Sequence, residues 1–429
     1  MPKTFFSYSF GCRVNHAEKE ALDRQLIARG YEFTDTNPNI CIINTCAVTH
    51  KAEREAKQYI YNIRRTFPLT KIIVTGCAST NWLKQNIRIA EVDLLIDNAS
   101  KEFIAEILDK EVNNITPSLT TNKIKFIQND KFLKSKRLIL KIQDGCHRFC
   151  SYCIVPYLRG LPLSVPSEKL VQTIKDYEHS IQEVVLTAIN TEAYGRDTQE
   201  SLTELLQNIL KQTSISRISF GSIHPWSIND ELLTFYENNL IHKRIVPFFH
   251  IPLQSGSNKM LNLMKRGYAR EEFIEKLRKL ASYDPFTFIA TDVIVGFLEE
   301  TDTDFEDTYT FLKESPISRF HVFRYSVREH TAGFYLGKRL KEPDAQTKHK
   351  RSKALIDLSL QKFTEFQKKH IGYTFQAFFL EKREGEYQYV LLDNNMEAVI
   401  YSKSDLCGEI HNVKIDTYKN KKIFGTIVE

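Results

Sequence analysis

Three cysteines in the first hundred residues each follow a short apolar run that is typical of a β-strand. Cys12 follows FFSYSF, Cys46 follows CIINT, and Cys77 follows KIIVT. Helical patterns at residues 17–29 and 50–65 separate these runs, which predicts βαβ units and a parallel sheet. Because the carboxyl ends of parallel strands share one edge of a sheet, we expect the three thiols to converge and to bind metal.

A second group of three cysteines lies within DGCHRFCSYC (residues 144–153), directly after the apolar run LILKI. Structural zinc needs four ligands, and His147 is adjacent to Cys146, so it is badly placed to be the fourth. Closely spaced thiolates suit a four-iron cluster, in which Cys146, Cys150 and Cys153 each bind one iron and the remaining iron stays open. We therefore predict an open iron–sulfur cluster, with structural zinc as the alternative.

The rest of the chain continues the alternation and then changes character. Strand-like runs recur at 183–189, 217–223, 248–253, 288–296 and 320–326, and helical segments separate them. This pattern predicts a partial or full α/β barrel, whose sites lie at the carboxyl ends of its strands. After a lysine-rich helical segment at 345–369, short strands separated by turns predict a small all-β barrel.

The fold class predicted is therefore α/β, with three domains. The first covers residues 1–113. A polar, weakly periodic linker covers 114–131, the barrel domain covers 132–364, and the β-rich domain covers 368–429.

Composition indicates a cytoplasmic protein. The 429 residues are 42% hydrophobic and 26% charged, and no apolar run approaches the roughly 20 residues of a membrane span. The amino terminus has no apolar core or cleavage site typical of a signal peptide. In a reducing compartment, eight cysteines indicate metal binding or catalysis rather than disulfides. Cys41, inside a strand run, and Cys407, in the β-rich tail, are interpreted as small core residues.

The net charge of +6 is concentrated in two stretches. Residues 114–141 hold seven Lys/Arg against one Asp, and residues 338–370 hold ten against four acidic residues. Both are compatible with solvated linker and helix faces. The alternative is a track for a polyanion, since clustered Lys and Arg bind nucleic acid backbones.

The cysteine loop after the first barrel strand resembles that of the radical S-adenosylmethionine family. Two three-cysteine sites followed by a β-rich tail resemble the methylthiotransferases within it. Further segments resemble motifs of that family: GCRVN (11–15), NTCAVT (44–49), VTGCA (74–78), EVVLTAIN (183–190), HIPLQSGS (250–257), KRGY (265–268), TDVIVGF (291–297) and HVFRYS (321–326).

The resemblance implies an amino-terminal methylthiotransferase domain, a radical S-adenosylmethionine core and a carboxyl-terminal TRAM domain. It implies two 4Fe-4S clusters, an auxiliary one on Cys12, Cys46 and Cys77 and a radical one on the three core cysteines. One S-adenosylmethionine would methylate a sulfur of the auxiliary cluster, and a second would supply the radical that takes hydrogen from the substrate carbon.

Three branches of the family differ in substrate. GCRVN and HVFRYSVREHTAG resemble the branch that methylthiolates carbon two of N6-threonylcarbamoyladenosine, next to the anticodon of tRNAs decoding ANN codons. The alternatives are isopentenyladenosine in tRNA and an aspartate of a ribosomal protein. A non-catalytic, metal-stabilised RNA-binding protein is the alternative outside enzymes. The implied partners are a tRNA anticodon stem-loop and an electron donor such as flavodoxin or ferredoxin; we expect a monomer and no membrane partner.

The candidate contacts to S-adenosylmethionine are chosen only because they lie at strand ends. Each of these residues is equally compatible with a packing role. The candidates are Thr187, Asn190, Ser222, Gln254, Val295 and Gly296. His224 and His250 are interpreted as ordinary hydrogen-bonded histidines.

RNA recognition is only partly visible in the sequence. The TRAM segment, 371–429, has seven Lys/Arg against nine Asp/Glu, which argues against a simple electrostatic role. Phosphate contacts are assigned instead to the basic stretches, as at Lys134, Lys136 and Arg137. Four aromatic residues of the tail could stack bases, although their spacing is more typical of a barrel core: Tyr373, Phe375, Phe378 and Phe379.

Three loops depart from the family pattern. LPLSVP follows Arg159-Gly160 where the family has an Arg-Ser-Arg element, and residues 296–301 are GFLEET where the family has GFPGET. Residues 328–331 are REHT where the family has Arg-x-Gly-Thr. We expect altered loop geometry around cofactor and substrate.

Overall fold

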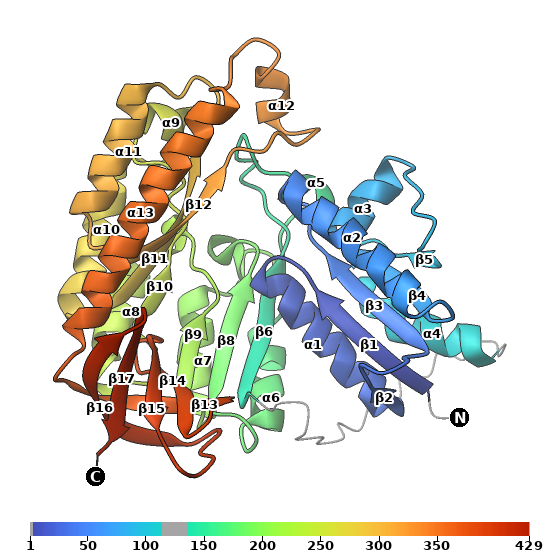
Figure 1. The fold of residues 1–429 in the computed structure, drawn as a ribbon, viewed down its shortest axis with the longest axis horizontal. Coiled ribbons are helices and arrows are strands. Elements are labelled where there is room, and N and C mark those ends of the chain that lie inside the picture. The colour runs from blue at the N-terminus through green and yellow to red at the C-terminus, as the bar shows by residue number, and fades with distance from the viewer. Residues whose placement is uncertain (1–2, 114–134, 429) are drawn as a thin grey trace.

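The computed structural model describes residues 3–113 and 135–428, which form two α/β units and a closed β-barrel (Figure 1). The predicted α/β fold class is therefore confirmed. The predicted linker, 114–131, lies outside the described residues. Within the described ranges, no helix combines the length and apolar character needed to cross a membrane.

The amino-terminal unit is a five-stranded parallel sheet in the order β2-β1-β3-β4-β5. Its elements are β1 (Lys3–Ser9), α1 (Arg13–Ala28), β2 (Tyr31–Phe33), β3 (Ile40–Thr45), α2 (His50–Thr66), β4 (Lys71–Gly76), α3 (Cys77–Lys84), β5 (Leu94–Leu95), the 3₁₀ turn η1 (Lys101–Phe103) and α4 (Ile104–Asn113). All six residues of β3 are buried, as expected for the central strand of a covered parallel sheet.

Helix α1 begins four residues earlier than residues 17–29 predict. Cys12 is the N-cap and makes no side-chain hydrogen bond to the first turn, so the usual Ser, Thr, Asp or Asn start signal is missing. The short strand β2 was likewise not predicted.

The central unit is a partial barrel built from two sheets, in the orders β7-β6-β8-β9 and β10-β11-β12. Its first half contains β6 (Arg137–Asp144), α5 (Val155–Arg159), β7 (Leu163–Ser164), α6 (Ser167–Tyr177), β8 (Glu183–Ala188), η3 (Thr191–Ala193), α7 (Leu202–Gln212), β9 (Arg217–Phe220), η4 (Pro225–Ser227), α8 (Asp230–Asn238) and η5 (Leu240–His242). Its second half contains β10 (Phe248–His250), α9 (Asn258–Leu263), α10 (Arg270–Tyr283), β11 (Phe288–Val295), α11 (Asp302–Glu314), β12 (Arg319–Arg324) and α12 (Ala332–Leu336). A parallel bridge between Ile218 and Ile245 joins the two sheets.

The chain then runs through the long helix α13 (Ala345–Lys369) into the carboxyl-terminal barrel. The barrel consists of β13 (Thr374–Glu384), β14 (Tyr387–Leu392), β15 (Glu397–Tyr401), β16 (Ile410–Lys419) and β17 (Lys422–Ile427). It closes in the order β13-β14-β15-β17-β16, so the prediction of a small all-β barrel is confirmed.

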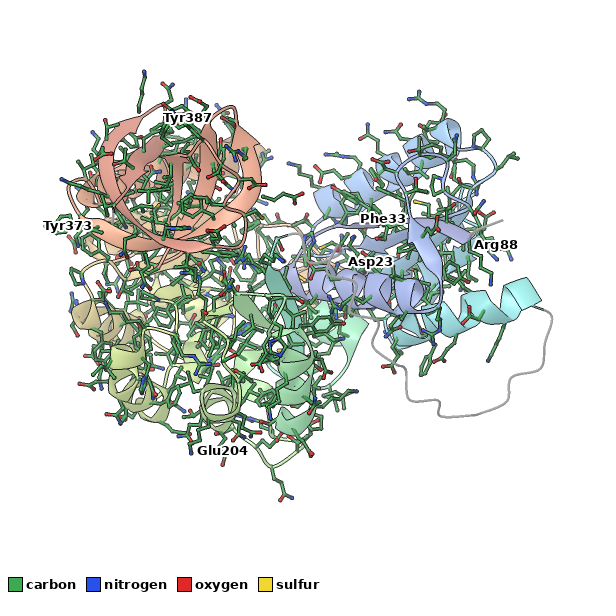
Figure 2. The ribbon with its side chains drawn as sticks, turned by 90° about the horizontal axis from the view of Figure 1, so that it is seen from below. Asp23, Phe33, Arg88, Glu204, Tyr373 and Tyr387 are labelled. Atoms are coloured by element: carbon green, nitrogen blue, oxygen red, sulfur yellow. The ribbon has the colours of Figure 1, made fainter. Side chains whose placement is uncertain are left out.

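The outer two units contact different parts of the core (Figures 1 and 2). Helix α1 packs against β6 and β8 of the core. The β-barrel lies at the amino end of the core strands, where Arg217 at the start of β9 donates to the carbonyl of Leu392 at 3.0 Å. The carboxyl ends of the core strands, where the cysteine loop lies, therefore face the amino-terminal unit and not the β-barrel.

Candidate functional site

The three amino-terminal cysteines lie at one edge of the sheet, as predicted. Cys12 follows β1, Cys46 follows β3, and Cys77 is the first residue of α3, directly after β4. A Cβ built on Gly11 would lie 2.6 Å from Cβ of Cys46 and 2.7 Å from its Sγ. Only glycine therefore allows the loop that carries Cys12 to lie against Cys46.

The three thiols also act on one another electrostatically. Burial, together with smaller contributions from Cys77 and Cys12, raises the pKa of Cys46 to about 12. Burial raises the pKa of Cys12, and Cys77 adds to this, although Cys12 still reaches solvent. Cys12 and Cys46 therefore lie in a region that favours their protonated forms unless a metal or a cation stabilises the thiolates.

Asn15, in the GCRVN segment, ties two of these strand ends together. Its side-chain nitrogen donates to the carbonyl of Phe10 at 2.8 Å and to the carbonyl of Thr45 at 3.0 Å. Phe10 precedes the Cys12 loop and Thr45 precedes Cys46, so Asn15 fixes the relative position of two cysteines.

The core cysteines lie on the loop between β6 and α5. Gly145 (φ 74°) and Phe149 (φ 46°) both adopt left-handed backbone conformations, which fold the loop back on itself. Burial, together with smaller contributions from Cys150 and Cys146, raises the pKa of Cys153 to about 12. The three thiols of this loop therefore also share one region.

The donors present fit iron–sulfur clusters. Three cysteines converge at each place, and cysteine thiolates are the usual ligands of such clusters. Among the described residues, no three His, Cys, Asp or Glu side chains are close enough to hold a single metal ion. An iron–sulfur cluster does not need its ligands this close together, because each thiolate binds a separate iron atom.

A buried arginine donates to a cysteine sulfur at the core site. Arg266 lies 3.4 Å from Sγ of Cys150 through Nη1, which also donates to the hydroxyl of Tyr152 at 3.1 Å. Its other nitrogens donate to Tyr268 and to the carbonyl of Pro252. All of these acceptors are neutral when Cys150 is a thiol, so none of these four contacts offsets the guanidinium charge.

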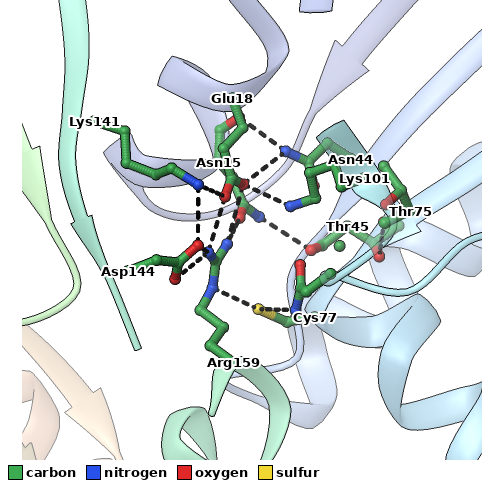
Figure 3. A network of polar contacts seen from close by, with 12 residues as sticks. Asn15, Glu18, Asn44, Thr45, Thr75, Cys77, Lys101, Lys141, Asp144 and Arg159 are labelled. Atoms are coloured by element: carbon green, nitrogen blue, oxygen red, sulfur yellow. Dashed lines mark hydrogen bonds and ion pairs between the residues drawn. The ribbon is translucent and has the colours of Figure 1, made fainter. Parts of the chain in front are cut away.

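A second buried arginine donates to a cysteine sulfur of the amino-terminal site (Figure 3). Arg159 ends α5 of the core, and its Nε lies 3.3 Å from Sγ of Cys77. Its Nη1 contacts both Glu18, at 2.9 Å, and Asp144, at 2.8 Å, while its Nη2 donates to Asn15 at 2.6 Å. Arg159 therefore links the core to three groups around the other cysteine site.

Two lysines complete this ionic network. Lys101 lies 2.5 Å from Glu18, and Lys141 lies 3.0 Å from both Glu18 and Asp144. Burial alone would raise the pKa of Glu18, but Arg159, Lys101 and Lys141 hold it well below the usual value. Cys77, Glu18 and Asp144 raise the pKa of Arg159 despite its burial. These shifts favour the charged forms of Glu18 and Arg159, whereas burial lowers the pKa of Lys101.

A second contact between the units lies farther from the cysteines. Arg328, 3% exposed, donates to Glu53 of α2 at 2.7 Å and contacts the ring of His50 at 3.1 Å. Arg328 belongs to the REHT segment that departs from the family pattern. The departure therefore leaves this arginine in a contact with the amino-terminal unit.

The GFLEET segment shows how the chain tolerates its other departure. Glu299 adopts a left-handed φ of 56° at the position where the family has glycine. Its backbone nitrogen donates to the carbonyl of Lys341 at 2.8 Å, and its carboxylate accepts from the Lys341 nitrogen at 2.7 Å. These bonds hold a conformation that is costly for a residue with a side chain.

The candidate S-adenosylmethionine residues lie at or beyond the carboxyl ends of core strands. Thr187 and Val295 lie within β8 and β11, and Gly296 directly follows β11. Asn190 and Ser222 stand two residues beyond β8 and β9, and Gln254 stands four residues beyond β10. Thr187 is buried in β8, and Val295 is buried at the end of β11. Asn190 caps η3 through its side chain, and Ser222 lies 2.7 Å from Nδ1 of His250. Gln254 bridges by its backbone to β11, and the amide of Gly296 donates to Glu300. Their contact with S-adenosylmethionine remains a prediction.

The two histidines have protein partners. His250 also contacts Asp292 at 3.1 Å through Nε2, so its ring is held between a hydroxyl and a carboxylate. Burial lowers the pKa of His224 to about 3, so this ring is neutral near pH 7, and it accepts from the amide of Thr191.

Most of the residues considered for RNA contact are engaged elsewhere. Phe375, Phe378 and Phe379 are 5%, 0% and 0% exposed, which confirms the barrel-core interpretation, whereas Tyr373 is 55% exposed (Figure 2). Arg137 is paired with Glu183 at 2.9 Å, so its assignment to phosphate is not supported. Lys134 lies outside the described residues.

Arg159, Arg266 and Glu18 are the residues of the site that the sequence patterns do not reveal. The arginines stand in the segments RG (159–160) and KRGY (265–268), which indicate family but not contact with a cysteine. Both partners of each contact come from distant parts of the chain, so no spacing rule could have paired them.

Two family models match the chain. Residues 140–312 match the radical SAM superfamily, and residues 4–97 match the uncharacterized protein family UPF0004.

Curated relatives cover nearly the whole chain. A threonylcarbamoyladenosine tRNA methylthiotransferase MtaB of Aquifex aeolicus is 35% identical over 87% of this chain and 92% of its own length. A protein of the same name from Bacillus subtilis is 32% identical over 95% and 92%. A tRNA-2-methylthio-N(6)-dimethylallyladenosine synthase of Sulfurimonas denitrificans is 30% identical over 99% of both chains.

Among solved structures, the radical S-adenosylmethionine methyltransferase TsrM of Kitasatospora setae superimposes with a TM-score of 0.57. It is 10% identical and covers 79% of this chain and 78% of its own. At that identity the likeness concerns the fold alone.

Proposed function

This chain belongs to the radical S-adenosylmethionine methylthiotransferases of tRNA, and from that premise we propose that it methylthiolates carbon two of N6-threonylcarbamoyladenosine. The target is the adenosine next to the anticodon in tRNAs that decode ANN codons. We choose this substrate over isopentenyladenosine because two relatives named for it are 35% and 32% identical to this chain. Isopentenyladenosine is the second candidate, because a relative of that kind is 30% identical over 99% of the chain.

We assign one cluster to each cysteine group. Cys146, Cys150 and Cys153 would hold the radical cluster, and the three sheet-edge cysteines the auxiliary one. When bound, the clusters and S-adenosylmethionine supply the electron, the radical and the sulfur of the reaction. The two arginine–sulfur contacts support this assignment, because hydrogen bonds to ligand sulfurs stabilise the negative charge of thiolates.

The chain itself must bring the two sites to one substrate carbon. Arg159 and its carboxylate partners fix the edge of the amino-terminal sheet against the core loop. Arg328 and Glu53 hold the same two units at a second point. Two separated contacts prevent rotation about either one, which favours a constant distance between the cysteine groups.

The remaining expectations follow from the family and stay proposals. We place the protein in the cytoplasm as a monomer that receives electrons from a flavodoxin or ferredoxin. The domain boundaries at 113, 131 and 364 are also retained as proposals. The β-barrel packs at the amino ends of the core strands, so it would contact tRNA away from the modified base.

Nucleoside mass spectrometry tests the proposed substrate. The anaerobically reconstituted full chain is incubated with anticodon stem-loops carrying threonylcarbamoyladenosine or isopentenyladenosine, and the digests are analysed for methylthiolated nucleosides. We expect product only from the first RNA, and none with Cys12→Ser/Cys46→Ser/Cys77→Ser. Product only from the second RNA would identify the isopentenyladenosine branch. Zinc in place of about eight irons would support the non-catalytic alternative.

A further inference from the structure

Arg13 extends from the amino-terminal cysteine site into the core barrel. It is the first residue of α1 and directly follows Cys12. A Cβ built on Gly221, one residue beyond β9, would lie 3.1 Å from Cδ of Arg13 and 2.8 Å from Oγ1 of Thr187. The aliphatic part of Arg13 therefore lies against the carboxyl ends of β8 and β9, where barrel enzymes bind their ligands.

The guanidinium of Arg13 has no hydrogen-bond or ion-pair partner among residues 3–113 and 135–428. Arg137 and Glu183, at the amino ends of β6 and β8, are the charged groups that act on it. Glu183 already accepts from Arg137 at 2.9 and 3.1 Å and from Ser219 at 2.5 Å, so both of its oxygens are in use. Arg13 thus adds a positive charge that Glu183, which is already paired, does not balance.

The guanidinium of Arg13, unpaired within the described residues, is suited to binding an anionic ligand. Arg13 is exposed to solvent, so a ligand can reach it, although its aliphatic part packs against Gly221. An anionic ligand would restore the charge balance and would engage donors that the protein leaves free. Guanidinium groups match planar carboxylates particularly well, because two parallel N–H groups meet the two oxygens.

We propose that Arg13 binds the carboxylate of the threonylcarbamoyl group on the target adenosine and thereby selects this substrate. The inference rests on the proposed function and names a specificity residue for it. The carboxylate is part of the substituent on N6 of the purine. Carbon two belongs to the six-membered ring that carries N6. A residue next to Cys12 that holds the N6 substituent therefore also orients carbon two toward that cysteine site. An isopentenyl group carries no charge and gains nothing from this contact.

The test compares the binding of three anticodon stem-loops to the reconstituted full chain by fluorescence anisotropy. The first carries threonylcarbamoyladenosine, the second its neutral threoninamide analogue, and the third unmodified adenosine. We expect the wild type to bind the first RNA about tenfold or more tightly than the second, as befits a charge-assisted hydrogen bond. R13Q should reduce this ratio to near one, and R13K should leave part of it.

R24Q is the matched control, because Arg24 also lies on α1 but stacks over Tyr177. It should keep the wild-type ratio. If R13Q weakens all three RNAs by one factor, Arg13 contacts the RNA backbone and the proposal is overturned; an unchanged ratio overturns it equally. Thermal unfolding and iron content establish that each variant folds. If R13Q does not fold, R13K decides, and an unchanged ratio in R13K overturns the proposal.

Turnover separates this inference from the proposed function. A wild-type chain that forms no methylthiolated product from the threonylcarbamoyl RNA contradicts the proposed function. A chain that forms this product but keeps its carboxylate preference in R13Q contradicts only the role of Arg13.

Discussion

Both cysteine groups contain three cysteines, but one is formed by a single loop and the other by three strand ends that are distant in the sequence. The core group is local, since three cysteines within eight positions fold back at the left-handed Gly145 and Phe149. The amino-terminal group joins three strand ends separated by more than thirty residues along the chain. The first depends on loop geometry, whereas the second exists only when the parallel sheet has formed.

The arginines beside the two groups also differ in whether their contacts stay within one unit or join two units. Arg266 has only neutral acceptors and lies within the core unit. Arg159 comes from the core, contacts a cysteine of the other unit, and has two carboxylate partners. The amino-terminal site is therefore incomplete without the core, while the core site contains all of its own parts. This asymmetry can be tested by removing one component at a time.

Removing either cysteine group should have the largest effect. Cys12→Ser/Cys46→Ser/Cys77→Ser and the corresponding change of the core cysteines should each lower the iron content from about eight to about four and abolish methylthiolation. Only the first variant should retain reductive cleavage of S-adenosylmethionine to 5′-deoxyadenosine, measured by liquid chromatography. Loss of this cleavage in both would show that the sites are not independent.

Glu18→Gln should have the next largest effect. It leaves Arg159, Lys101 and Lys141 with an excess of buried positive charge, and breaking such a buried network costs about 3 kcal/mol of unfolding free energy. The chain has two tryptophans, one in each α/β unit, so Trp226→Phe leaves Trp82 to report unfolding of the amino-terminal unit by urea.

The pH dependence of this effect has a defined sign. The pKa of Glu18 in the folded protein lies well below 4.5, so its contribution to stability is complete above pH 4.5 and declines as pH falls through the folded value. The matched control is Glu20→Gln on the same helix. Burial raises the pKa of Glu20 above 4.5, so its charged form opposes folding at neutral pH, and its removal should cost little or should stabilise. Equal losses from both variants would contradict the network.

The arginine contacts predict a smaller, electronic effect. Arg266→Gln and Arg159→Gln remove an N–H···S bond and a positive charge, so each should lower the reduction potential of its own cluster. For Arg266 we expect about a tenfold change in the reduction equilibrium, about 59 mV for one electron. The shift for Arg159 should be smaller, because Glu18 and Asp144 already offset its charge.

Redox titrations followed by electron paramagnetic resonance measure both shifts, each in a background that lacks the other cysteine group. Arg→Lys variants keep the charge and should recover part of the potential. Unchanged potentials in both glutamine variants would show that the arginines serve only to pack the site.

Cys41→Ala should have the smallest effect. Cys41 is completely buried within β3, so the change should cost about 1 kcal/mol of stability and leave the iron content and product yield unchanged. Iron loss in this variant would place a fourth cysteine at the amino-terminal site and would weaken the comparison between the two groups.

The sequence by itself determined both cysteine groups and the order of the three units. Strand periodicity and the rule that parallel strands end at one edge are local properties with a single topological consequence, and Cys12, Cys46 and Cys77 do lie at one edge. The same reasoning placed the start of α1 four residues late, because Cys12 caps that helix without the usual side-chain signal.

Only the tertiary structure decided how the units meet. Arg159 and Cys77 are 82 positions apart, and Arg328 and Glu53 are 275 positions apart. A buried charge finds its partner through the packing of whole sheets and helices, and no periodicity in the chain records that pairing. The same holds for Arg13, which the sequence places beside a cysteine and the fold places against the barrel strands.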